Sequence, residues 1–218
     1  MSLHAIIARR QRALIASWVR SPLVQVQVES PGALPGLVFI SDAGEAGMAS
    51  GVGRRDERNV AMVTRAGDPD TQASCWVAAR YSGYRSAYLA FIREAYGVRA
   101  TSAELAGFDV DHLLNRARSP QDSTFIRIEA IPAAANQDWG RLFEKAASDP
   151  RFYANQQRER RTMSWVICAK LAGQAPPNGP GDQAGINRLV QYFVSIGLDA
   201  AEARDGLNSM LSFAYKFR

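Results

Sequence analysis

The chain is poor in the residues that build disulfide frameworks, thiolate metal sites and imidazole clusters. Its 218 residues include only two cysteines and two histidines. Cys75 and Cys168 stand far apart in apolar surroundings, which excludes a disulfide framework and predicts two buried thiols. His4 lies in a predicted helix near the start, so any chemistry that needs an imidazole depends on His112.

Long apolar runs are also missing. No stretch approaches the roughly 20 consecutive apolar residues of a membrane span. Arginines interrupt the first twenty residues, which argues against a secretory signal. We therefore expect a cytoplasmic protein with no membrane partner, and delivery into another cell is compatible with the same features.

The composition is that of an ordinary soluble globular protein, with 47% hydrophobic and 22% charged residues. The 26 basic residues exceed the 21 acidic ones, which gives a formal net charge of +5. An excess of this size suits a polyanionic partner such as nucleic acid. It is equally typical of a basic, solvated surface.

Hydrophobic periodicity predicts an α+β fold in a single domain over residues 1–218. An amphipathic helix opens the chain, and the valines of residues 23–29 alternate with polar residues as in a strand. Residues 42–58 are predicted to be a long loop. The other predicted strands are 37–40, 59–65, 73–81, a strand ending at His112, and 125–132. The other predicted helices begin at 84, 136, 149, 186 and 207. The part from 149 to 218 is predicted to be helical.

Residues 109–144 contain the parts that cleavage of a phosphodiester bond requires. The reaction needs a base, a divalent cation and a group that holds the phosphate. His112 is the candidate base, because imidazole titrates near neutral pH. The candidate oxygen ligands for one Mg²⁺ are Asp111, Asn136 and Glu144. The candidate phosphate-holding residues are Arg116, Arg118, Arg127 and Arg141.

These residues resemble the core of the ββα-metal (His-Me finger) nucleases, over about residues 108–147. The second half of the motif is similar to the non-specific DNA/RNA endonucleases, since Ile131-Pro132 leads to Asn136, Trp139 and Leu142-Phe143-Glu144. The resemblance implies a general base at His112, a direct metal ligand at Asn136 and a water-mediated metal contact at Glu144. It also implies a nucleic-acid substrate, more often DNA than RNA.

The first half departs from that branch. Those endonucleases carry Asp-Arg-Gly-His, whereas this chain has Asp109-Val110-Asp111-His112 and lacks the arginine. Asp-His resembles the HNH branch, in which the aspartate is a metal ligand, although no later histidine completes an HNH site. Arg116 or Arg118 is the candidate replacement for the missing arginine. Small nucleases of this type often act as toxins, which implies an immunity-type partner by analogy alone.

Each of these residues also has an ordinary structural interpretation. His112 is compatible with a hydrogen-bonded core histidine, and Asn136 with the N-cap of the helix that it begins. Glu144 suits a solvated helix face, and Trp139 suits a packing position. The joint order of the residues favours the nuclease.

Two other classes of function remain open. One is a non-catalytic nucleic-acid-binding or accessory protein that uses the basic helices predicted around Arg9–Arg12 and Arg158–Arg161. The other is an interaction protein whose C-terminal amphipathic helices, residues 186–218, pack on a partner or on a second copy.

Overall fold

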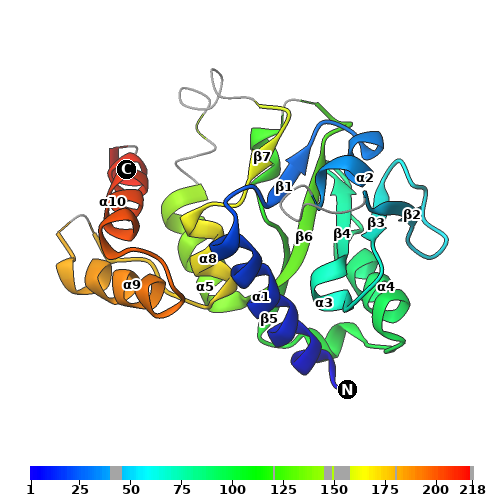
Figure 1. Cartoon of the computed structure of the whole chain (residues 1–218), viewed down its shortest axis with the longest axis horizontal. Coiled ribbons are helices and arrows are strands. Elements are labelled where there is room, and N and C mark those ends of the chain that lie inside the picture. Colours follow the sequence, from blue (N-terminus) through cyan, green and yellow to red (C-terminus); the bar gives the residue numbers. More distant parts are fainter. Residues whose placement is uncertain (40–45, 120, 145–148, 150–157, 180, 217–218) are drawn as a thin grey trace.

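The structure is a computed structural model that describes the chain except residues 40–45, 120, 145–148, 150–157, 180 and 217–218. The side chains of Glu144 and Lys216 also lie outside the description. Helices and an antiparallel, curled sheet make up the described chain, which confirms the α+β class (Figure 1). Among the described helices, none has both the length and the apolar composition that crossing a membrane requires.

The elements follow the chain in an order that alternates helices and strands until residue 132. Figure 1 labels most of them. The helices are α1 (Leu3–Arg20), α2 (Leu34–Leu37), α3 (Pro69–Gln72), α4 (Tyr84–Tyr96), α5 (Ala133–Trp139), α8 (Trp165–Leu171), α9 (Gln183–Ser195) and α10 (Ala200–Lys216). The strands are β1 (Gln25–Val28), β2 (Met48–Gly51), β3 (Val60–Thr64), β4 (Ala73–Ala78), β5 (Phe108–His112), β6 (Phe125–Pro132) and β7 (Arg161–Thr162). Short helical turns are η1 (Pro31–Ala33), η2 (Ser102–Leu105), η3 (Arg116–Arg118) and the π-helical η4 (Gly140–Glu144).

Strand β6 is the centre of the sheet, whose order is β2-β3-β4-β6-β1-β7 with β5 also paired to β6. One edge of β6 pairs with β4, in which Cys75 lies opposite Ile128. A strand has only two edges, so β1 and β5 share the other edge end to end. Gln27 of β1 lies opposite Ile126, and His112 of β5 lies opposite Ile128.

Helix α1 covers the length of β6 that β4 leaves unpaired. The amide nitrogen of Gln11 donates to the backbone oxygen of Ala130 at 2.9 Å. The apolar residues of α1 divide between two core clusters. Leu3, Ile6 and Ile7 pack with α4, and Leu14, Ile15 and Trp18 pack with α5, α8 and α9.

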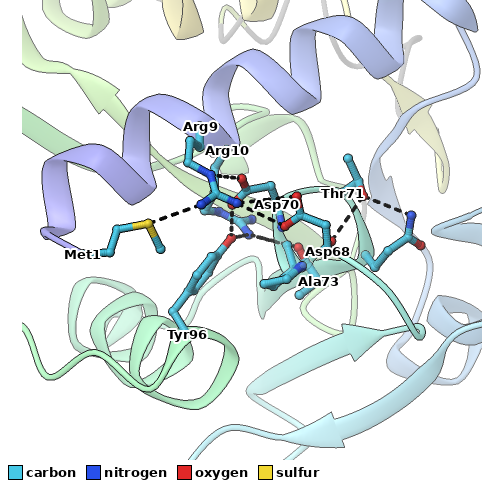
Figure 2. A network of polar contacts seen from close by, with 10 residues as sticks. Met1, Arg9, Arg10, Asp68, Asp70, Thr71, Ala73 and Tyr96 are labelled. Atoms are coloured by element: carbon cyan, nitrogen blue, oxygen red, sulfur yellow. Dashed lines mark hydrogen bonds and ion pairs between the residues drawn. The ribbon is translucent and has the colours of Figure 1, made fainter.

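A buried ion-pair network fixes α1 to the sheet. The guanidinium of Arg10 lies 2.5 and 3.1 Å from the two carboxylate oxygens of Glu129, and Arg127 lies 2.9 Å from the same carboxylate. The side chains of Arg10 and Glu129 are only 1% and 3% exposed. Arg10 also donates to the backbone oxygen of Ala73 and to the hydroxyl of Tyr96 (Figure 2).

The network continues to the surface through Asp70. The hydroxyl of Tyr96 donates to Asp70 at 2.8 Å, and Arg9 reaches the other oxygen of this carboxylate at 2.5 Å (Figure 2). Asp68, the N-cap of α3, also lies within 3.3 Å of Arg9. Each buried charge therefore has an opposite charge beside it, as burial requires.

Three predictions about local structure were wrong. Residues Leu37–Phe39 do not form a strand; Pro35 at the start of α2 favours a helical turn, which buries Leu34. The predicted loop 42–58 contains β2, an edge strand whose exposed side chains lack an alternating pattern.

The third error concerns the arginine-rich run before α8. Residues 150–157 of the predicted helix lie outside the described part, but Arg158–Arg160 are not helical and Arg161 belongs to β7. Pairing of β7 with β1 overrides the helix propensity of this segment. The basic helix expected at Arg158–Arg161 is therefore not present.

The C-terminal helices follow the prediction. Helix α9 ends before Gly197, and buried Ile186, Leu189 and Phe193 share a core cluster with Leu207 and Leu211 of α10. Their apolar faces are thus used within the chain.

The buried network gives a stability prediction. Glu129→Gln keeps the shape but leaves Arg10 and Arg127 buried without a counter-charge, so we expect a loss of about 3–5 kcal/mol in the free energy of unfolding. Urea denaturation followed by circular dichroism measures it. Glu29→Gln is the matched control, because Glu29 pairs with Arg160, whose side chain is 56% exposed, and should cause a much smaller loss. Equal losses would contradict the role of the buried pair.

Candidate functional site

Strand β5 carries the first group of candidate residues, and its two faces meet different helices. Helix α4 packs on one face, and α5 and α8 lie toward the other. Successive side chains of a strand alternate between the faces. Val110 and His112 therefore face α4, whereas Asp109 and Asp111 face α5 and α8.

His112 is a buried, neutral side chain. Its ring lies 4.7 Å from the ring of Tyr84, it is 5% exposed, and its Nε2 is buried with no hydrogen-bond partner among the described residues. Burial lowers the pKa of His112 to about 4; the charge of Asp111 opposes this shift and that of Arg116 adds to it. A neutral imidazole can accept a proton, which is the state that a general base needs.

Asp111 is held from two sides. Its Oδ1 accepts the backbone N–H of His112 at 2.9 Å. Its Oδ2 lies 3.4 Å from the ammonium of Lys170 on α8, a side chain that is 1% exposed. A buried ammonium needs an opposite charge nearby, and Asp111 supplies one.

Asn136 lies within α5 and does not cap it, because the helix begins at Ala133 with Pro132 at the N-cap position. Its Nδ2 donates to Asp109 at 3.3 Å, and its Oδ1 is buried with no hydrogen-bond partner among the described residues. Asp109 and Asp111 share a face of β5, so Asn136 and Asp111 lie on the same side of the strand.

The structure thus places Asp111 and Asn136 on the same side of β5, with Asn136 bonded to Asp109, and places His112 on the other side. Glu144 ends the π-helical turn after α5, and its side chain lies outside the described residues. Trp139 is fully buried and donates to the backbone oxygen of Gln174 at 2.7 Å, as a packing residue does.

The four candidate phosphate-holding arginines separate into two pairs. Arg127 is buried against Glu129, which lies opposite Asp111 in the register of β6 with β5, and its charge is used by that carboxylate. Arg141 pairs with Asp138 on the surface. Arg116 and Arg118 lie in η3, just after β5, and line two different hollows.

These hollows lie on either side of the η3 segment. One, of about 570 Å³, is lined by Arg80, Asn115 and Arg116 together with Ala79, Ala117, Ser119 and Gln121. The other, of about 410 Å³, we call the arginine cleft. Its lining residues are Gln25, Leu114, Arg118, Phe143, Arg158, Arg160, Arg161, Thr162, Ser164, Ile167 and Met210.

Sequence reasoning missed two features of the candidate site. Lys170 beside Asp111 was not recognised, although a lysine inside the apolar run of α8 is a signal for a buried charge. The arginine cleft was also missed, because Arg118 and Arg161 are brought together only by the pairing of β7 with β1.

The oxygen atoms on the Asp111 side suit a hard cation such as Mg²⁺. A carboxylate and a buried, unpartnered amide oxygen are of the right chemical type. Within the described ranges, no three side chains of histidine, cysteine, aspartate or glutamate converge in a way that holds a metal. The residues present fit a cation in the chemical type of their donors, a carboxylate at Asp111 and an amide oxygen at Asn136. A cation at Asp111 would displace the Lys170 ammonium from Oδ2 or the His112 N–H from Oδ1.

Comparisons of the chain with models of protein families, with curated proteins and with solved structures found no match. The resemblance of residues 109–144 to ββα-metal nucleases therefore stays a prediction.

The buried imidazole gives a pH prediction. Because the pKa of His112 is about 4 in the folded chain and about 6.5 in a model peptide, the unfolded chain binds more protons between these values. The contribution of the neutral His112 side chain to the free energy of unfolding is fully present above pH 6.5 and is lost as the pH falls to 4. Relative to His112→Gln, the wild type should lose up to about 3 kcal/mol over this range. Urea denaturation at several pH values measures this difference; parallel pH curves for the two proteins would contradict it.

Proposed function

We propose that this protein is a metal-dependent nuclease that hydrolyses phosphodiester bonds in DNA or RNA. The observation that carries the proposal is the Oδ1 of Asn136, which is buried with no hydrogen-bond partner among the described residues. The amide nitrogen of the same side chain bonds Asp109, on the face of β5 that also carries Asp111. A buried acceptor without a hydrogen bond is unfavourable. A bound cation would satisfy it.

In the proposed site, Asp111 and Asn136 hold one Mg²⁺, with Glu144 as a further ligand from the resemblance. When bound, the cation neutralises the charge that develops on the phosphate and the leaving oxygen. Lys170 orients the carboxylate of Asp111, and the backbone N–H of His112 fixes its other oxygen. Arg116 and Arg118 extend from the segment after β5 toward the phosphates.

His112 is the proposed base, and its action requires a change in the backbone at the end of β5. In the described conformation its ring packs on Tyr84, away from Asp111. Nε2 has no hydrogen-bond partner among the described residues, so the conformation carries an unsatisfied polar atom. The face to which a strand side chain points is set by the backbone. A change of backbone dihedral angles where β5 leads into Leu113 would turn the neutral imidazole toward the Asp111 face, where it would accept a proton from the attacking water.

A non-catalytic nucleic-acid-binding protein is the second candidate. The observation that favours it is the placement of His112 and Asn136 on opposite faces of β5. In this case the Asp111–Lys170 pair is structural, and only the basic surface meets nucleic acid.

Cleavage of plasmid DNA and of RNA, with Mg²⁺ or with EDTA, tests the proposal. We expect cleavage by the wild type with Mg²⁺ only, and a loss of at least about 100-fold in His112→Ala and Asn136→Ala. Two matched controls are available: His4→Ala replaces the other histidine, which is exposed, and Asn208→Ala replaces an exposed asparagine of α10. Both should keep the wild-type rate.

Two outcomes would contradict the nuclease. One is the absence of cleavage by folded protein with Mg²⁺, Mn²⁺ or Ca²⁺. The other is equal cleavage by wild type and His112→Ala. Retained binding of nucleic acid without cleavage would then support the second candidate.

A further inference from the structure

The arginine cleft combines a positive rim with an apolar floor. We call three of its lining residues the rim, namely Arg118 of η3 and Arg158 and Arg161 of the segment that ends in β7. We call its apolar lining the floor, to which Phe143 and Met210 contribute. We propose that this cleft binds a single-stranded segment of nucleic acid, with phosphates on the arginines and a base on the floor. The inference rests on the nucleic-acid part of the proposed function and not on cleavage.

Positive charges gather in this cleft at a cost in free energy. Burial, together with the positive charges of Arg118 and Arg158, lowers the pKa of Arg161 to about 10. Like charges held close together repel one another, and a phosphate bound among them reduces this repulsion. A phosphodiester backbone supplies one negative charge for each nucleotide.

Not every arginine of the cleft is assigned to phosphate. Arg160 is paired with Glu29 at 2.5 and 2.9 Å, so we assign it a structural role. Arg118 and Arg161 also have interactions within the protein. The proposal requires only their charge and their place in the lining of the cleft.

Gln27 joins the two segments that carry the arginines. This fully buried side chain donates to the backbone oxygens of Arg158 and Glu159 at 2.5 and 3.3 Å. Its Oε1 accepts a hydrogen bond from Ser119, the residue that follows η3, at 3.3 Å. The positions of the two arginine segments are therefore fixed relative to each other by β1, which makes the rim a built feature of the fold.

The floor distinguishes a single strand from a duplex. A duplex stacks its bases inside and offers mainly phosphates, whereas a single strand exposes bases that pack on aromatic and apolar side chains. Phe143 is half-buried and meets Phe213 edge-on, with ring centroids 5.9 Å apart. A recess of about 410 Å³ is within the size range of small-ligand pockets and suits an inserted nucleotide.

The cleft also lies close to β5 along the chain. Leu114, two residues after His112, is part of its floor, and Arg118 is part of its rim. A strand bound in the cleft therefore passes the end of β5 that carries the candidate catalytic residues.

The first test asks whether the rim arginines bind phosphates. It measures the binding of a labelled single-stranded 20-mer by fluorescence polarisation in EDTA, at several salt concentrations. Three phosphate contacts predict a slope of about −2 for the logarithm of the association constant against that of the salt concentration. We expect Arg118→Gln, Arg158→Gln and Arg161→Gln each to weaken binding about fivefold and to reduce the slope by about 0.7. Arg99→Gln, at an exposed residue outside the cleft, removes the same charge and should leave binding nearly unchanged. The side chain of Arg158 is exposed, so Arg158→Gln should fold normally. Unchanged affinity and an unchanged salt slope in this variant would overturn the assignment of the rim.

The floor has its own test. Phe143→Leu keeps an apolar side chain, so the fold should persist, and it should weaken binding of the 20-mer about threefold without changing the salt slope. An oligonucleotide without bases should bind the wild type and Phe143→Leu equally. If a duplex or heparin binds as tightly as the single strand and Phe143→Leu has no effect, the cleft recognises charge alone and the single-strand assignment is wrong. Binding is measured in EDTA, so it does not depend on cleavage. A protein that binds the 20-mer in EDTA but does not cleave nucleic acid with Mg²⁺ would refute the nuclease and leave this inference standing.

Discussion

The ion pair between Arg10 and Glu129 is the interaction on which the rest of the structure depends. It joins the first helix to the central strand across 119 residues of sequence, in a place where neither charge meets water. Glu129 lies opposite Asp111 in the register of β6 with β5. The strand that α1 holds is therefore the strand that positions the candidate site. Placement of Asp111 beside Lys170 follows from this register, because a slip of one residue would turn Asp111 to the other face.

Much of the fold could be predicted from periodicity. The stripe of Tyr88 and Phe91 in α4 and the spacing of α9 reflect the face that each helix buries. The alternating valines predicted the strand β1, although Gln25 and Gln27 on its other face are buried as well. Elements whose side chains carry no such pattern were missed. Strand β2 lies at an edge with exposed side chains, and β7 consists of Arg161 and Thr162, so both are stabilised by backbone pairing that leaves no trace in local sequence.

For the candidate site, the sequence predicted the elements but not their arrangement. The order of Asp111, His112 and Asn136 along the chain predicted a strand end, a second strand and a helix, and the structure has β5, β6 and α5 there. Simple alternation in β5 already implies that adjacent Asp111 and His112 point to opposite faces, and that step separates the metal-type ligands from the candidate base. The contact of Lys170 with Asp111 depends on where α8 packs, and the arginine cleft depends on residues about 40 positions apart that β1 aligns. Neither the contact of Lys170 with Asp111 nor the closeness of the two arginine segments can be read from local sequence patterns.

The central position of β6 has a consequence for how the chain is made. Strands β2, β3 and β4 can pair as soon as they are synthesised, because they are neighbours in both sequence and sheet. Helix α1 meets α3 and α4 soon after it is made. Strand β1, although it comes early, has its partner strands only when residues 125–132 and 161–162 leave the ribosome. Until then both edges of β1 are unpaired, a state that favours association with other chains or with chaperones.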